Sequence, residues 1–197
     1  MRRIGITGGI GSGKSVVSRL LRIMGYSVYD TDSEAKRLME SSLEVVQKLS
    51  ECFGRDIYHN GRLNRGLLSS RVFGKSDKIV LLNSIVHPVV RFDFYRWSES
   101  LNEEICFVES AILYEAGFQD TVDAVIMVYA PVELRIQRAM YRDGASEEQV
   151  WARIAAQMDD EEKRRRADFT VVNDGVQLLI PQLNRIVEQL KTEKFIL

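Results

Sequence analysis

The chain contains one motif that fixes much of the fold around it, Gly8-Gly9-Ile10-Gly11-Ser12-Gly13-Lys14-Ser15. The motif fits the pattern G-x-x-x-x-G-K-[ST], in which a glycine-rich turn joins a buried strand to the first turn of a helix. Residues 3–7 precede it and can form a short buried strand, and residues 16–24 follow it with apolar side chains at helical spacing. The sequence therefore predicts a strand, a loop and a helix at the start of an α/β fold.

The loop also has the chemistry of a polyphosphate site. Glycines leave room for several backbone N–H groups to turn toward one point, and a helix N-terminus adds unpaired N–H groups and a positive dipole end. In such a loop Lys14 is expected to span the β- and γ-phosphates, and the Ser15 hydroxyl is expected to bind Mg²⁺. The alternative, a glycine-rich turn beside an exposed lysine, is disfavoured by the complete spacing and by both flanks.

Charge and cysteine content disfavour several other classes of protein. The 197 residues carry a formal net charge of -1, so the chain has no overall positive field for nucleic acid or an anionic membrane. The two cysteines, Cys52 and Cys106, lie too far apart in sequence for a paired redox or zinc motif. No signal peptide or membrane-spanning run is recognisable, so we expect a protein of the cytoplasm.

Strand-like segments alternate with helical patterns along the chain, which is typical of a three-layer α/β fold with a mainly parallel sheet. Short runs rich in Val and Ile suit strands that are buried on both faces. We predict five strands, over residues 3–7, 26–29, 105–109, 123–129 and 169–172.

The same pattern divides the chain into three parts. A mostly helical stretch over residues 34–104 interrupts the strand rhythm, and we interpret it as an insertion that binds the second substrate. The segment Ser146-Glu147-Glu148-Gln149 predicts a capping box that opens a new helix, and we interpret residues 141–166 as a mobile lid. The nucleotide-binding core is then expected to comprise residues 1–33, 105–140 and 167–197.

Acidic residues follow the second predicted strand, in the segment Asp30-Thr31-Asp32-Ser33-Glu34. Ligands of open α/β sheets bind beyond the carboxyl ends of the strands, so these carboxylates are expected at the same edge of the sheet as the glycine loop. Asp32 is the candidate for a general base that accepts a proton from an acceptor hydroxyl. In the structural alternative, Asp32 or Ser33 caps a helix that begins near Glu34, and the two roles are compatible.

Three further groups of charged residues are candidates for a functional or a structural role. Glu109 and Glu115, at and shortly after the end of the third strand, either support Mg²⁺ or are ordinary exposed charges. Arg138 and Arg142 share one face of the helix after the fourth strand and are candidates for clamping the transferred phosphate. In the run 159–166 each acid stands four residues before a base, which favours a solvated helix face of internal ion pairs over a patch that binds nucleic acid.

The helical stretch contains local signals of its own. Asn60-Gly61 predicts a tight turn. Pro88 is expected to kink or restart a helix that runs from Ser76 to Val86, because proline removes one hydrogen-bond donor and crowds the preceding turn. A histidine directly before a proline, as at His87, is most often a hydrogen-bonded structural residue.

In their order and spacing, these segments resemble the dephospho-CoA kinase family, which performs the last step of coenzyme A synthesis. The resemblance covers nearly the whole chain. It is carried by the loop from Thr7 to Ser15, Asp30-Thr31-Asp32, Gly61-Arg62-Leu63-Asn64-Arg65, Val72-Phe73, His87-Pro88, Leu113-Tyr114-Glu115, Arg138, Arg142-Asp143, Gln157, and Ala167-Asp168 leading to Asn173. The resemblance implies a P-loop kinase fold with a nucleotide core, a helical CoA-binding region and a lid.

The family pattern also implies roles for the matching residues. The catalytic base falls on Asp32, and the other implied catalytic residues are Lys14, Arg138 and Arg142. The implied ATP-binding residues are Gly11, Ser12, Gly13, Lys14, Ser15, Val16 and Asn173, the last near the adenine. The implied acceptor-binding residues are Asp32, Arg65, His87 and Glu115, and Ser15 would bind Mg²⁺. The implied reaction transfers phosphate from ATP to the ribose 3′-hydroxyl of dephospho-CoA, and neither nucleic acid nor a membrane is expected as a partner.

The chain departs from the family pattern at three places. Val16 stands where the family commonly has threonine, which removes a hydroxyl from the α-phosphate end. Glu109 stands where an aspartate is common, and Ser110-Ala111-Ile112 replaces a segment that usually contains proline, so both changes bear on the metal-side acid. Two other functions stay open. One is a kinase for another small hydroxyl acceptor, such as a nucleoside or nucleotide. The other is a GTPase-type switch, which is disfavoured because neither Asp-x-x-Gly nor Asn-Lys-x-Asp occurs.

Overall fold

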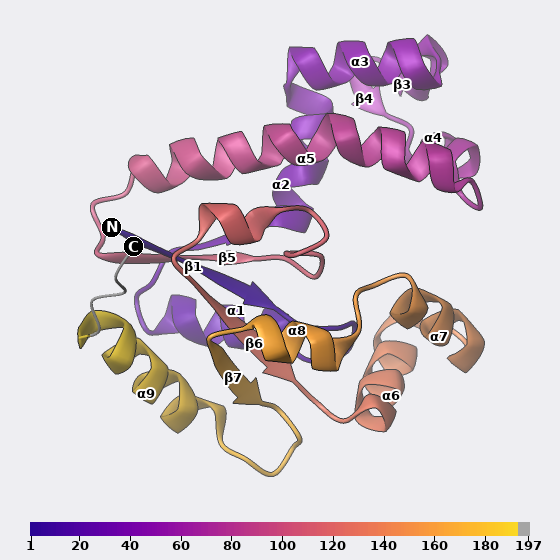
Figure 1. The fold of residues 1–197 in the computed structure, drawn as a ribbon. Coiled ribbons are helices and arrows are strands. Elements are labelled where there is room, and N and C mark those ends of the chain that lie inside the picture. Colours follow the sequence, from indigo (N-terminus) through magenta and orange to yellow (C-terminus); the bar gives the residue numbers. More distant parts are fainter. Residues whose placement is uncertain (193–197) are drawn as a thin grey trace. The chain divides into compact units, whose positions relative to one another are not determined.

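The computed structural model describes residues 1–192, and the chain forms two compact units (Figure 1). The core unit contains Met1–Tyr29 and the chain from Asn102 onward, and the insertion unit contains Asp30–Leu101. The insertion predicted over residues 34–104, as the region that binds the second substrate, stays a prediction. The roles assigned to these parts, and the lid over residues 141–166, stay predictions.

The core unit is built on a five-stranded sheet in the order β2-β5-β1-β6-β7, which confirms the predicted architecture. The strands are β1 (Arg2–Thr7), β2 (Val28–Asp30), β5 (Ile105–Glu109), β6 (Ala124–Tyr129) and β7 (Phe169–Val172). Strand β1 is central and pairs in parallel with β5 and β6, and β6 pairs in parallel with β7. Because the carboxyl ends of parallel strands meet at one edge of a sheet, the loops after β1, β6 and β7 gather there.

Strand β2 begins two residues later than predicted, at Val28 rather than at residue 26. The preceding residues are used to end helix α1 (Lys14–Ile23). Gly25, with φ of 93°, donates its N–H to Arg22 O at 3.1 Å, and Tyr26 donates to Leu21 O at 3.0 Å. These two bonds close the C-terminal turn of a helix, so Tyr26 cannot also start the strand.

One face of the sheet packs against α1 and α9 (Leu179–Thr192), which lie side by side (Figure 1). Helix α1 buries Val17 and Leu21, and α9 buries Leu183 and Val187. Both pairs have the four-residue spacing that places side chains on one face of a helix. These four side chains pack with strand side chains in a single core cluster. The buried face of α1, the helix that follows the glycine loop, is therefore packed on the sheet.

The other face of the sheet is covered by the segment after β5 and by α8 (Asp160–Arg166). Side chains alternate along a strand, so Gly5 faces away from the cluster that holds Ile4 and Ile6. A Cβ on Gly5 would meet the Leu113 side chain, and α8 packs against β6. Helices α6 (Val132–Asp143) and α7 (Glu147–Ala155) pack on each other, and the predicted capping box at Ser146 is confirmed.

The insertion unit is mostly helical, with α2 (Thr31–Ser41), α3 (Leu43–Phe53), α4 (Arg65–Val72) and α5 (Ser76–Glu99). A short 3-10 turn, Arg55–Ile57, leads into a hairpin of β3 (Tyr58–His59) and β4 (Arg62–Leu63). Asn60 and Gly61 form its turn with φ of 49° and 74°, which confirms the predicted tight turn.

Of the two effects predicted for Pro88, the restart is wrong, because α5 runs from Ser76 to Glu99 as one helix, and the kink stays a prediction. Proline leaves the carbonyl four residues earlier, that of Ser84, without its helical donor. Pro88 and Ser84 are both exposed, so water can replace the missing donor. Neither this 24-residue helix nor any other in residues 1–192 combines the length and apolarity that crossing a membrane requires.

Candidate active site

The glycine loop presents the uncapped start of α1. Helix α1 begins at Lys14, and its N-cap residue, Gly13, has no side chain to accept the first N–H groups. Gly11 and Gly13 have φ of 76° and 96°, in the left-handed region. A Cβ on Gly13 would overlap the Asn173 amide, and a Cβ on Gly11 would overlap the Arg135 backbone. Unpaired N–H groups and the helix dipole together favour an anion at this position.

The two polar side chains of the motif lie at this helix start. Lys14 Nζ donates to Gly8 O at 2.8 Å and to Gly9 O at 3.2 Å, so the ammonium lies across the loop. Ser15 is exposed, and its hydroxyl has no hydrogen-bond partner within the described part of the chain. A positive charge and a free hydroxyl are the groups that hold a phosphate chain and its Mg²⁺ in such loops.

The Ser15 hydroxyl is suited to a metal ion that takes its other ligands from a bound substrate. Within residues 1–192 no group of three or more His, Cys, Asp and Glu side chains is placed to hold a metal ion. Mg²⁺ keeps several waters and binds substrate phosphates together with few protein groups. Ser15 is therefore suited to a magnesium ion that arrives with a polyphosphate.

Asn173 and Arg138 lie next to the loop, as parts of one hydrogen-bonded group. Asn173 Nδ2 donates to Ser12 O at 2.8 Å, and its backbone N–H donates to Tyr129 O at 2.8 Å. Arg138 Nη1 donates to Asn173 O at 2.9 Å. The loops after β1, β6 and β7 are therefore bonded to one another through Asn173.

Arg142 is placed differently from Arg138, although both were predicted to clamp phosphate. Arg142 is exposed and forms an ion pair with Asp143 at 2.8 Å, and Asp143 also pairs with Arg153 at 2.7 Å. Hydrogen bonds from Arg142 lower the pKa of Asp143 to about 2. The structure brings Arg138 to the loop, whereas the role of Arg142 stays a prediction.

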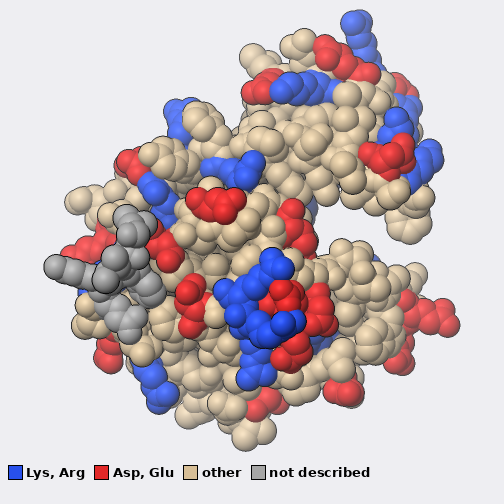
Figure 2. Space-filling view, in the orientation of Figure 1, with Lys and Arg blue, Asp and Glu red and all other residues tan. Residues whose placement is uncertain are grey.

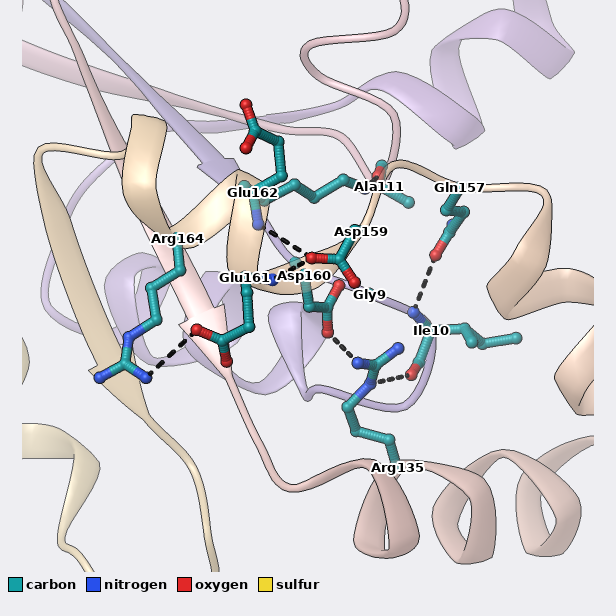
Figure 3. A network of polar contacts seen from close by, with 12 residues as sticks. Gly9, Ile10, Ala111, Arg135, Gln157, Asp159, Asp160, Glu161, Glu162 and Arg164 are labelled. Atoms are coloured by element: carbon teal, nitrogen blue, oxygen red, sulfur yellow. Dashed lines mark hydrogen bonds and ion pairs between the residues drawn. The ribbon is translucent and has the colours of Figure 1, made fainter.

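Two further residues, Arg135 and Gln157, bond to the glycine loop at Ile10 (Figure 3). Arg135 Nε donates to Ile10 O at 3.0 Å, and its guanidinium also pairs with Asp160. Gln157 Oε1 accepts from Ile10 N at 3.1 Å. Of these residues, Gln157 belongs to the family pattern seen in the sequence, whereas no local sequence signal singles out Arg135 or Asp160.

The prediction that the run 159–166 pairs only with itself is wrong in part. Asp159 caps α8, with its side chain accepting from Glu161 N at 3.0 Å and Glu162 N at 3.1 Å, and Asp160 pairs with Arg135. The outer side does pair internally: Glu162 pairs with Arg165 and Arg166, and intermixed charges cover α8 (Figure 2). The difference arises because α8 packs against β6 and so turns one of its faces inward.

Glu115 has structural partners. Its carboxylate accepts from Met158 N at 2.8 Å and pairs with Lys163 at 3.1 Å. Lys163 is fully buried and also donates to Ala111 O at 2.7 Å. Burial lowers the pKa of Lys163, and the Glu115 charge partly opposes this effect. Glu115 thus joins α8 to the segment after β5, and its predicted acceptor-binding or metal-side role stays a prediction, as does that of Glu109.

In the insertion unit, the capping alternative for Asp32 and Ser33 is wrong. Helix α2 begins at Thr31, earlier than expected, and Asp30 is its N-cap. Asp30 Oδ1 accepts from Asp32 N at 3.1 Å and from Ser33 N at 3.4 Å. The Asp32 carboxylate lies in the first turn of α2, is exposed and has no side-chain partner among the described residues.

The other predicted acceptor residues of the insertion unit lie on separate helices. Arg65, at the start of α4, pairs with Glu40 at 3.1 Å and is exposed. His87 is half-buried in α5, and burial together with the nearby Arg91 charge lowers the pKa of its imidazole. His87 is therefore a neutral side chain near neutral pH, consistent with a structural position.

Residues 2–178 match the model of the dephospho-CoA kinase family. The chain belongs to the dephospho-CoA kinase family. A dephospho-CoA kinase from Bacteroides fragilis is 47% identical over 186 residues, which cover 94% of this chain and 91% of that protein. One from Porphyromonas gingivalis is 45% identical over 195 residues, covering 98% of this chain and 96% of that protein. The resemblance read from the sequence is confirmed.

Solved structures place the fold among P-loop kinases. A crystal structure of a Thermus thermophilus protein has a TM-score of 0.84 at 37% identity and covers 98% of both chains. Dephospho-CoA kinase from Campylobacter jejuni has a TM-score of 0.69 at 24% identity, covering 95% of this chain and 96% of that one. Shikimate kinase from Acinetobacter baumannii shares the fold alone, with a TM-score of 0.57 at 19% identity and coverage of 97% and 93%. Membership of this kinase family makes the chain a phosphotransferase with an alcohol acceptor.

Proposed function

We propose that the chain transfers the γ-phosphoryl group of ATP to the ribose 3′-hydroxyl of dephospho-CoA, giving coenzyme A and ADP. The observation that carries this proposal is the uncapped start of α1, with Lys14 across the glycine loop, in a chain that matches dephospho-CoA kinases over residues 2–178. We further propose that the enzyme acts in the cytoplasm on these two small-molecule substrates.

The reaction forms one bond and breaks one bond. The acceptor oxygen attacks the γ-phosphorus, the bond from that phosphorus to the β–γ bridging oxygen breaks, and ADP leaves with that oxygen. The proton of the hydroxyl passes to the Asp32 carboxylate. Two features support Asp32 as the base: no side chain among the described residues competes for its carboxylate, and it stands two residues after Asp30, the last residue of β2. Carboxyl ends of strands are where ligands of open α/β sheets bind.

The ATP side of the site is assigned to the glycine loop and its neighbours. Backbone N–H groups from Gly11 to Val16 bind phosphate oxygens, and Lys14 moves from the Gly8 and Gly9 carbonyls to the β- and γ-phosphates. Ser15 would hold Mg²⁺, which would neutralise part of the negative charge of the phosphates. Because Val16 lacks a hydroxyl, its contribution at the α-phosphate end is the backbone alone.

Arg138, Arg142 and Asn173 complete the assigned nucleotide site. Arg138 and Asn173 are bonded to each other and to Ser12, which supports a position beside the phosphates and the adenine. Arg142 is assigned to the lid and would have to exchange Asp143 for phosphate as the lid closes. Closure excludes water, which otherwise competes with the acceptor for the phosphoryl group.

The acceptor side is assigned to Asp32, Arg65, His87 and Glu115. Exposed Arg65 carries the charge that a phosphate of dephospho-CoA requires. His87, neutral near pH 7, is suited to hydrogen bonding rather than to charge pairing. Glu115 would have to exchange its contacts with Lys163 and Met158 N for the acceptor.

The acceptor assay tests this function directly. The purified chain is incubated with ATP and Mg²⁺ and with dephospho-CoA, AMP, adenosine or shikimate, and both ADP and the phosphorylated product are measured. We expect stoichiometric ADP and coenzyme A with dephospho-CoA, and at most trace product with the other acceptors. Efficient phosphorylation of another acceptor, with none of dephospho-CoA, would show a P-loop kinase of different specificity.

A further inference from the structure

A buried ion pair lies directly against the glycine loop. Arg135 is part of α6, and Asp160 is the first residue of α8. Their side chains are only 5% and 13% exposed. The Arg135 guanidinium lies between two acceptors, the Asp160 carboxylate and Ile10 O, to which Nε donates at 3.0 Å (Figure 3). One side chain thus joins α8 to the backbone of the loop.

Ile10 is held on both sides of its backbone. Its carbonyl accepts from Arg135, and its N–H donates to Gln157 Oε1 at 3.1 Å. Gln157, which follows α7, accepts the N–H bond directly, and Asp160, the first residue of α8, supports the carbonyl bond through Arg135 of α6. Residues outside the motif therefore hold the backbone of the glycine loop in place at Ile10.

Gly9 shows how closely the pair approaches the loop. A Cβ on Gly9 would overlap the Arg135 guanidinium and lie 2.6 Å from Asp160 Oδ1. In the pattern G-x-x-x-x-G-K-[ST] this position is unrestricted, and Gly9 does not have positive φ. The glycine is required here by the ion pair rather than by the backbone conformation.

We propose that Arg135 and Asp160 are positioning residues of the phosphate-binding loop, acting on ATP through Gly9 and Ile10. The proposal rests on the proposed function, in that the loop binds ATP phosphates. Gly9 O also accepts from Lys14 Nζ at 3.2 Å, so a displacement of Gly9 changes the starting position of the phosphate-binding ammonium. Neither residue of the pair has to touch the nucleotide for this effect.

The chemistry of the pair explains why arginine is needed. A guanidinium has donors fixed in a planar fork and can serve two acceptors at once, whereas the single ammonium of lysine cannot reproduce this geometry. Burial lowers the pKa of Arg135, but a guanidinium stays charged at neutral pH. Removing the cation leaves the Asp160 charge buried without its partner, so the carboxylate is expected to move toward water. Ile10 O loses its Arg135 donor at the same time, and the loop loses its link to α8.

Equilibrium binding of ATP and Mg²⁺, measured by calorimetry without any acceptor, tests the proposal. Arg135→Lys keeps a cation beside Asp160 but loses the geometry of the Ile10 bond, and we expect ATP affinity to fall about tenfold. For Arg135→Met we expect a loss on the order of tenfold to a hundredfold. The matched control is Glu162→Gln, which removes exposed ion pairs on the outer side of α8 and should bind ATP like the wild type.

A double-mutant cycle separates positioning from a general loss of stability. Gly9→Ala alone should weaken ATP binding, because its Cβ displaces the guanidinium. When Gly9→Ala is added to Arg135→Met, it should reduce ATP affinity by a much smaller factor. A stability defect alone would lower the amount of binding-competent protein without changing the dissociation constant. Wild-type ATP affinity in folded Arg135→Lys and Arg135→Met, or fully additive effects in the cycle, would overturn the proposal. If the wild type itself bound no ATP, the proposed function would fail instead.

Discussion

Asn173 donates its side-chain amide to the carbonyl oxygen of Ser12 at 2.8 Å, which ties the loop after β7 to the glycine loop after β1. The two residues are 161 positions apart in sequence. The Asn173 backbone N–H is bonded to Tyr129 at the end of β6, so one residue joins three neighbouring strand ends. The glycine loop is thus held from the β7 side by Asn173 and from the α6 side by Arg135.

Asn173→Ala removes the amide that holds Ser12. Because Ser12 O loses a hydrogen bond of about 0.5 to 1.5 kcal/mol, we expect the KM for ATP to rise roughly twofold to tenfold. The KM for dephospho-CoA at saturating ATP should stay unchanged. Steady-state kinetics with each substrate varied in turn measures both values, and an equal change in both would argue against a role confined to the nucleotide side.

Gly13→Ala introduces a Cβ where the Asn173 amide lies, at a residue with φ of 96°. Strain in the left-handed region costs on the order of 1 kcal/mol, and the displaced amide adds to this cost. We expect both a lower free energy of unfolding and weaker ATP binding. Gly25→Ala is the matched control, since Gly25 has φ of 93° but a Cβ there would meet no atom within 4 Å. Gly25→Ala should lower the free energy of unfolding without weakening ATP binding. If Gly25→Ala weakened ATP binding as much as Gly13→Ala does, the effect at Gly13 would not come from the Asn173 amide.

His87 should lower the free energy of unfolding of the chain at acidic pH. Burial, with Arg91, lowers the pKa of His87 in the folded chain below the ordinary value of 6.5, so the unfolded chain binds more protons in the interval below 6.5. The free energy of unfolding therefore decreases as pH falls through this interval, and it is unaffected by this group well above it. The free energy of unfolding, measured in urea, should decrease less for His87→Gln than for the wild type between about pH 7 and about pH 5. The exposed His59 offers the control, and if His59→Gln flattened the profile equally, His87 would not be its source.

The architecture followed from the sequence because its signals are local. The motif from Gly8 to Ser15 fixes strand, loop and helix together, and alternating patterns indicated the sheet of five strands. Asn60-Gly61 and the Ser146 capping box are likewise encoded within a few residues. Even the error at β2 was local, since Gly25 was not recognised as the closing residue of α1.

The residues that hold the glycine loop and its neighbouring segments in place could not be predicted from the sequence, because they act through contacts between distant segments. Arg135 and Asp160 are 25 residues apart, and the acid looked like part of a self-paired helix. Lys163 belongs to the same charged run, yet it is fully buried against Glu115. Asp30 caps α2 in place of Asp32 because the helix begins at Thr31, a difference of a few residues that spacing alone does not resolve.

We propose that the glycine loop holds ATP while Asp32 deprotonates the acceptor alcohol, and the variant Asp32→Asn tests these two roles together. The measurement compares turnover of dephospho-CoA with the ATP dissociation constant of the same preparation. Glu44→Gln, another exposed acid in the first turn of a helix of the insertion unit, serves as the control. General-base catalysis contributes about 100-fold to 10,000-fold, so turnover should fall by that factor while ATP affinity stays close to wild type. Turnover near the wild-type rate in Asp32→Asn would contradict the account.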